Sequence, residues 1–119
     1  MYLYSIRRFL HLTVRSRDIE AAIKATLAAG LHPLDQACCG NFGRIEFLLE
    51  ARQPESAKQL ALRVLQRLDG PLSFRLFKDL PASVDAPSFF AGLAGIGYTL
   101  LRLDDPARLP CVLRWESRS

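Results

Sequence analysis

Two adjacent cysteines, Cys38 and Cys39, are the residues whose type and spacing most directly suggest chemistry. Gly40 follows them and permits a turn that could aim both sulfurs at one metal ion. Because zinc ligands are usually separated by two or more residues, an adjacent pair alone is a weak zinc signal. The pattern therefore leaves three interpretations open: two buried structural cysteines, a pair of metal ligands, or a strained disulfide between neighbours.

The remaining reactive side chains do not form a pattern that supports a site. His32 precedes Cys38 in a loop and could turn back toward it, but a loop histidine is more often solvated. His11 lies in an apolar run and is expected at the edge of a core, and Cys111 is expected to pack as a small apolar residue. Thiol redox chemistry would require an exposed pair with a low pKa, and the sequence indicates neither. We assign no catalytic residue.

The cysteines are expected to lie between helices. Apolar residues recur at helical spacing in four segments, over residues 18–29, 44–51, 54–70 and 87–103. A short strand over residues 73–77 and an extended tail over residues 109–116 are possible exceptions. The predicted fold class is therefore all-α.

Two glycine-containing blocks resemble each other within this helical pattern. GNFGRIEFLL begins at Gly40 and GLAGIGYTLL begins at Gly92, so the offset is 52 residues. In both blocks glycines stand at the first and fourth places, and a Leu-Leu pair closes the block. Because glycine weakens a helix, its repeated use at one helix position suggests repeated helical hairpins that pack closely side by side.

Composition and charge limit the classes of protein to consider. The chain has 119 residues, of which 50% are hydrophobic and 24% charged, as in a single folded domain. Its net charge of +4 comes from four arginines that precede the first acidic residue, Asp18. This pattern lacks the basic stripe of a nucleic-acid binder, and no apolar run is long enough to span a membrane. We therefore expect a cytoplasmic protein with reduced thiols.

Two long segments resemble a known family. FFAGLAGIGYTLLRLDDPARLPCVLRWE and DIEAAIKATLAAGLHPLDQACCGNFGRIEFLLEA are similar to the C-terminal end of lanthionine synthetase C-like cyclase domains, in particular those of class II (LanM-type) lanthipeptide synthetases. The resemblance divides the chain into a poorly matching basic segment, residues 1–17, and a domain portion, residues 18–119. It implies part of an α/α toroid built from helical hairpins.

The resemblance also implies a metal site and a reaction. Cys38 and Cys39 match the family's zinc-binding Cys-Cys-Gly element, which makes Gly40 and Gly43 site-shaping residues. The implied reaction joins a cysteine thiolate of a precursor peptide to dehydroalanine or dehydrobutyrine, forming a thioether ring.

Two expected parts of the family's site are missing from the sequence. No cysteine precedes Cys38, and no histidine stands in the motif of the family's acid/base group. We therefore expect a truncated cyclase domain that is inactive alone, with a precursor peptide or the remainder of a split synthetase as its partner. A partial toroid should leave an apolar face uncovered. The alternative is a non-catalytic helical module that binds a peptide or partner.

Overall fold

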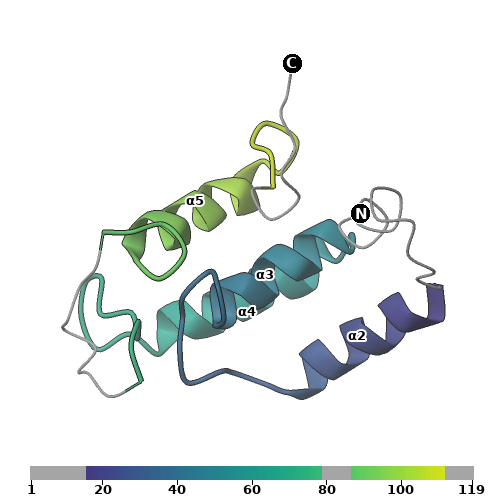
Figure 1. Cartoon of the computed structure of the whole chain (residues 1–119), viewed down its shortest axis with the longest axis horizontal. Helices are drawn as coiled ribbons and strands as arrows, with labels where there is room; N and C mark the ends of the chain where they lie inside the picture. The colour runs from purple at the N-terminus through teal and green to yellow at the C-terminus, as the bar shows by residue number, and fades with distance from the viewer. Residues whose placement is uncertain (1–15, 79–86, 112–119) are drawn as a thin grey trace.

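Helices are the only regular secondary structure in the described residues, and loops and turns join them. The structure is a computed structural model, and it describes residues 16–78 and 87–111 (Figure 1). Three segments lie outside these ranges: residues 1–15, which include His11, residues 79–86, and the tail beyond Cys111. The helices of the described part are α2 (Ser16–Ala28), α3 (Asn41–Glu50), α4 (Pro54–Gln66) and α5 (Leu93–Asp104). The all-α prediction is therefore confirmed, and none of these helices is long and apolar enough to cross a membrane.

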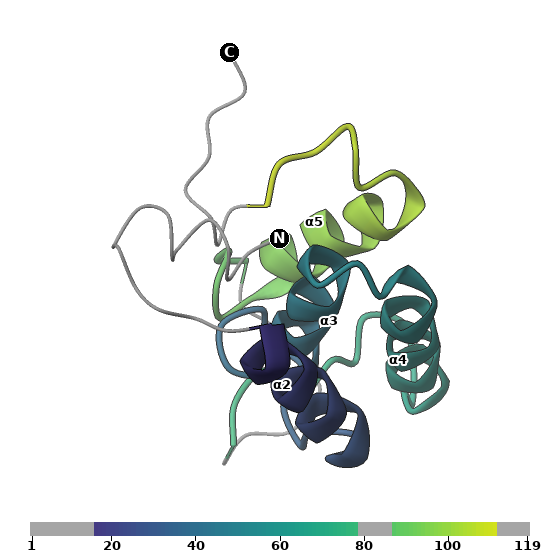
Figure 2. The same ribbon diagram turned by 90° about the vertical axis from the view of Figure 1, so that its right-hand side faces the viewer.

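Helix α3 lies at the centre of the core. It packs against both α4 and α5, while α2 lies on another side of it (Figure 2). Phe42, Ile45 and Leu48 of α3 follow helical spacing and are completely buried, and Ala57 and Val64 of α4 face them. Helix α3 is therefore packed against neighbours on more than one side.

Two apolar stripes predicted from the sequence are less buried than expected. Leu27 of α2 is 49% exposed. Among the residues of that helix whose burial is described, Ile19 alone is buried. Leu65 of α4, which stands at helical spacing in the apolar pattern, is 40% exposed, and Leu62, one turn earlier, is also exposed. Both leucines lie among exposed polar residues of α4, and the uncovered apolar face expected of a partial toroid stays a prediction.

The predicted strand over residues 73–77 is wrong. Phe74 and Leu76 are buried while Arg75 is exposed, so the alternation of a strand is present. The Arg75 backbone N–H, however, donates to Asp35 Oδ2 at 2.8 Å, and Arg75 O accepts the Asp35 backbone N–H at 2.7 Å. Gln36 Nε2 donates to Leu76 O at 2.5 Å, so a side chain again takes the place of a neighbouring strand and no ladder forms.

The last helix begins later than predicted. The sequence placed its start at Pro87, whereas α5 starts at Leu93. The Phe89 carbonyl packs where a side chain at Gly95 would stand, and the Phe90 carbonyl accepts the Cys38 N–H at 3.0 Å. These contacts occupy the backbone ahead of Gly92, which is the N-cap residue.

The two glycine-containing blocks take the same place in their helices. Gly40 and Gly92 are the N-cap residues of α3 and α5, both with extended backbone and without a side-chain cap. A Cβ at Gly43 would meet Ala37 O at 2.6 Å, and one at Gly95 would meet the carbonyl of Phe89, which stands at the matching position. The repeat seen in the sequence is therefore also a repeat in space.

A buried charge cluster joins the later turns of the two helices. The Arg102 guanidinium of α5 pairs with Glu46 and, at 2.6 Å, with Glu50, both from α3. Thr99 Oγ1 donates to Glu46 Oε1 at 2.9 Å. Burial raises the pKa of Glu46 and outweighs the effects of Arg102 and Thr99, which favour its charged form. Burial lowers the pKa of Arg102, but the charges of Glu46, Cys111 and Glu50 and the hydrogen bond to Glu50 together outweigh it, so the net pKa is raised and Arg102 stays charged.

Candidate metal centre

The turn that carries the cysteines is closed by backbone hydrogen bonds. The first backbone N–H groups of α3, from Asn41 and Phe42, donate to the carbonyls of Leu34 and Asp35 at 2.9 and 3.2 Å. The Gly40 N–H donates to Gln36 O at 2.9 Å. Residues ahead of the cysteines therefore satisfy the start of the helix, and the chain between them must bend back on itself.

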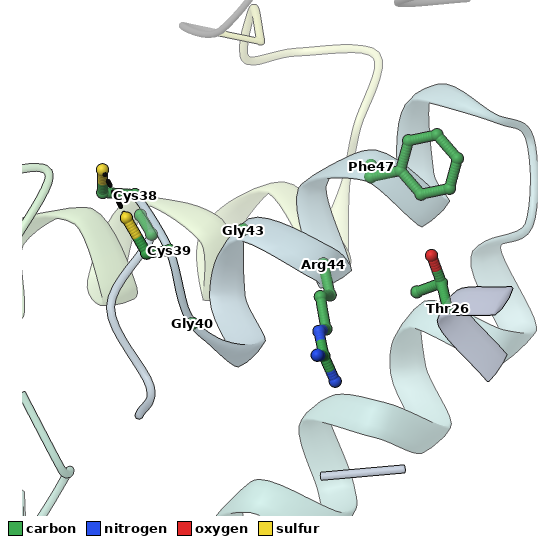
Figure 3. A pocket seen from close by; sticks show the side chains of 8 residues that line it. Thr26, Cys38, Cys39, Gly40, Gly43, Arg44 and Phe47 are labelled. Carbon is green, nitrogen blue, oxygen red and sulfur yellow. Dashed lines mark hydrogen bonds between the residues drawn. The ribbon is translucent and has the colours of Figure 1, made fainter. Parts of the chain in front are cut away.

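Cys38 and Cys39 lie at the tip of this bend with both thiols exposed. The Cys39 thiol donates a hydrogen bond to Cys38 Sγ at 3.1 Å (Figure 3), and no disulfide joins the two sulfurs. This arrangement overturns the interpretation as two buried structural cysteines, because the bend lifts both side chains away from the core. It also overturns the interpretation as a disulfide between neighbours, because both cysteines are free.

The spacing of the two sulfurs suits a shared metal ion. Zinc binds sulfur at about 2.3 Å, so two sulfurs of one tetrahedral site lie roughly 3.8 Å apart. The observed 3.1 Å between Cys38 Sγ and Cys39 Sγ needs only a small side-chain rotation to reach that value. The donor pair therefore fits two corners of a zinc site.

Gly40 and Gly43 stand where the bend tolerates no side chain. A Cβ at Gly40 would lie 2.5 Å from Leu34 O and 2.7 Å from Gln36 N. One at Gly43 would lie 2.6 Å from Ala37 O. Both conflicts are with backbone atoms, which cannot rotate away. The bend thus depends on these two glycines, and their role in a metal site stays a prediction.

The electrostatics of the pair disfavour free thiolates. The contact with Cys39 raises the pKa of the Cys38 thiol, with smaller contributions from burial and from the Cys39 charge. The raised pKa opposes a redox role, although the exposure of the pair, which the sequence did not indicate, would permit one. A metal ion that takes the place of the proton would remove the repulsion between the sulfurs.

The other donor residues do not complete the site within the described residues. No group of three or more His, Cys, Asp or Glu side chains there is placed to hold a metal ion. His32 Nδ1 accepts the Leu34 backbone N–H at 2.9 Å, which leaves the proton of the neutral ring on Nε2. This tautomer has no free lone pair for a metal. Cys111 is buried, as predicted, and lies by the Arg102 cluster.

A pocket of about 240 Å³ extends from the cysteines along α3. Thr26 of α2 and Phe47 of α3 lie at its far end, and Arg44 lies between them and the cysteines (Figure 3). Arg44 Nη1 donates to Gly30 O at 2.9 Å, which ties the loop after α2 to α3. The thiol pair is therefore reachable from an open hollow.

A buried polar cluster beside the bend was missed by sequence reasoning. Its members, which we call the Asp35 cluster, are His32, Asp35, Asn41 and Arg67. Asp35 Oδ1 accepts from Asn41 Nδ2 at 2.9 Å and from Arg67 Nη2 at 2.5 Å. The only available signal was an acidic residue and an amide that flank the Cys-Cys-Gly run, and Arg67 is too distant in sequence to associate with them.

Comparison with known proteins identifies the family. A protein-family model described as lanthionine synthetase C-like protein matches residues 1–114. The chain therefore belongs to the lanthionine synthetase C-like family, and its helical structure agrees with a segment of that family's helical toroid. No curated protein and no solved structure gives a match. The match includes the basic first seventeen residues, and the division at residue 17 stays a prediction.

Proposed function

We propose that this chain is the C-terminal part of a zinc-dependent lanthipeptide cyclase domain of the class II type. The observation that carries the proposal is the exposed thiol pair, with sulfurs 3.1 Å apart, in a chain of the lanthionine synthetase C-like family. Family membership supports the cyclase type. The adjacent Cys38 and Cys39, followed by Gly40, support the class II form of the metal element.

The proposed reaction adds a peptide cysteine to a dehydrated residue. The thiolate sulfur forms a bond to the β-carbon of dehydroalanine or dehydrobutyrine, the π bond between the α- and β-carbons breaks, and its electron pair takes up one proton at the α-carbon. Cys38 and Cys39 would hold zinc through their sulfurs, and the pocket beside them would admit the peptide. When bound, zinc supplies a Lewis acid that keeps the peptide cysteine in its thiolate form at neutral pH.

We propose that the chain by itself is not a competent cyclase. Two thiolates leave tetrahedral zinc short of ligands, and the described residues offer no third donor in place. His32, whose Nδ1 accepts a backbone N–H, is poorly suited to move a proton at the thiols. The missing groups would come from the remainder of a split synthetase, which would also cover Leu62 and Leu65 of α4. Cyclisation of a peptide that carries cysteine and dehydroalanine by the chain alone would contradict this proposal.

The test is the zinc content of the purified chain, measured by elemental analysis. Cys38→Ala with Cys39→Ala should abolish whatever zinc the wild type holds, whereas Cys111→Ala should retain it. Circular dichroism on each variant shows that the fold persists. If the double variant keeps its zinc, these cysteines are not the ligands.

The alternative function is a non-catalytic module that binds a peptide or partner through the exposed flank of α4. Leu62, at 55% exposure, and Leu65 favour it. Loss of both thiols distinguishes the two functions, since partner binding through α4 should survive Cys38→Ala with Cys39→Ala.

A further inference from the structure

The Asp35 cluster adjoins the cysteine turn, and the proposed function gives it no role. Asp35 is 0% exposed, so its charge needs partners. Asn41 and Arg67 donate to Oδ1, and the Arg75 backbone N–H donates to Oδ2 at 2.8 Å. The buried carboxylate is therefore held by donors from three separate places in the chain.

Asn41 closes the turn through its side chain. Its Oδ1 accepts the His32 backbone N–H at 2.7 Å, and its Nδ2 donates to His32 O and Asp35 Oδ1, both at 2.9 Å. Arg67 Nη1 also donates to His32 O at 2.9 Å. The chain from Asp35 to Asn41 is thus a closed loop with Cys38 at its centre. Such a buried network favours a single conformation of the turn, because any shift of the backbone would leave a buried polar group without a hydrogen bond.

The second repeat shows that a helix start of this shape does not need such a cluster. Helix α5 begins with the same N-cap glycine and the same close glycine contact as α3. With the offset of 52 residues, the matching residues are Pro87 for Asp35, Leu93 for Asn41, Phe90 for Cys38 and Ala91 for Cys39. The polar cluster is therefore found in the repeat that has thiols and is replaced in the repeat that lacks them.

We propose that Asp35 and Asn41 are positioning residues that hold the turn so that both sulfurs point to one metal ion. This inference rests on the proposed zinc role of Cys38 and Cys39. A preformed turn keeps the two sulfurs close before the metal arrives, so less conformational freedom is lost on binding. Outer groups that orient ligands in this way typically change metal affinity by about 10–100-fold when removed.

The test is cobalt binding to the full chain, followed by absorption spectroscopy. Cobalt(II) reports thiolate ligation through a charge-transfer band and reports geometry through its visible bands. Asn41→Ala should weaken cobalt binding at least about tenfold and alter the visible bands. Thr99→Val is the matched control, because it removes a buried side-chain hydrogen bond in the second repeat, away from the thiols. It should leave the cobalt affinity within about twofold and the spectrum unchanged.

Each outcome supports or overturns the inference. Equal cobalt binding by wild type and Asn41→Ala overturns it, as does an equal loss in Thr99→Val, which would point to stability alone. Absence of cobalt binding by the wild type overturns the inference together with the metal role proposed for Cys38 and Cys39, and leaves the family membership of the chain unaffected. Should Asn41→Ala fail to fold, Arg67→Lys takes its place, since it keeps the charge but loses the fork that joins Asp35 to His32. An Arg67→Lys variant with wild-type affinity and spectrum overturns the inference too.

Discussion

The starts of α3 and α5 are built on one backbone plan but carry different chemistry. Both begin at a glycine N-cap, and both place a second glycine against the carbonyl of a residue six positions earlier. The start of α3 adds Cys38 and Cys39 together with the buried Asp35 cluster. The start of α5 has Phe90 and Ala91 at the thiol positions. The comparison separates what the fold requires, which is the glycines, from what a metal site would require, which is the thiols and their support.

The largest expected effect comes from breaking the link between the two helices. Arg102→Ala leaves Glu46 and Glu50 buried without their cation, and loss of one partner of a buried ion pair costs about 3–5 kcal/mol. We expect that decrease in the free energy of unfolding, measured with urea. Arg63→Ala, an exposed arginine of α4, should change it by less than about 0.5 kcal/mol. Similar values for both variants would show that the buried cluster does not hold the repeats together.

The next effect tests the shared backbone plan. Gly43→Ala and Gly95→Ala each drive a Cβ into a backbone carbonyl, so we expect a loss of about 2 kcal/mol in each. Gly97 is exposed, and a Cβ there meets nothing within 4 Å. Gly97→Ala should therefore stabilise α5 by about 1 kcal/mol. If only one of Gly43 and Gly95 proves sensitive in thermal unfolding, the two helix starts are not equivalent.

A smaller effect concerns the pH dependence of stability. The pKa of Glu46 is raised in the folded state by burial, so the folded state keeps a proton that the unfolded chain releases above about pH 4.3. This contribution is fully present below that pH and is lost as the pH rises through the raised pKa. The free energy of unfolding should fall there by at most about 1.4 kcal/mol per pH unit.

Glu46→Gln should remove this part of the pH dependence, although the loss of the ion pair lowers stability at neutral pH. Glu20→Gln, an exposed change on α2, should leave the dependence in place. Urea titrations at a series of acidic pH values measure both. A Glu46→Gln curve that runs parallel to that of the wild type would contradict the raised pKa.

The smallest expected effect is that the zinc content of the chain without Cys38 and Cys39 stays unchanged when two thiols are placed at the start of α5. Phe90→Cys with Ala91→Cys, made in the chain that also carries Cys38→Ala and Cys39→Ala, moves the thiols to the second repeat. Because Pro87 and Leu93 cannot support that turn as Asp35 and Asn41 do, zinc should not return. Elemental analysis measures it. Recovered zinc would mean that two adjacent thiols at a helix start suffice by themselves.

The sequence allowed the repeat and the helices to be predicted, because both depend on local spacing. Apolar periodicity located α4, and the glycine pattern predicted that α3 and α5 are related, although it did not fix the residue at which either helix begins. The early start predicted for α5 was wrong because the Phe89 carbonyl packs against Gly95 and the Phe90 carbonyl accepts the Cys38 N–H, which overrides local preference. The expected strand around Arg75 failed for the same reason, since Asp35 takes its backbone bonds.

The candidate site was predictable only in part. Cys38 and Cys39 were recognisable as adjacent cysteines with a family resemblance, but their exposure depends on how the loop closes. The Asp35 cluster brings Arg67 from the end of α4 to a loop far earlier in the chain. No local sequence pattern predicts such a contact, because it depends on tertiary packing.

One backbone hydrogen bond sets the order in which the turn can be completed during synthesis. The Cys38 N–H donates to the carbonyl of Phe90, which follows it by 52 residues. Helices α3 and α4 can pair as soon as the ribosome has released them, since they are neighbours in the chain. The bonds that close the cysteine turn come from residues up to Arg75, so the turn can form before Phe90 emerges. Only the Cys38 N–H must wait for its acceptor, and the last bond of the turn is therefore made when the second repeat docks on the first.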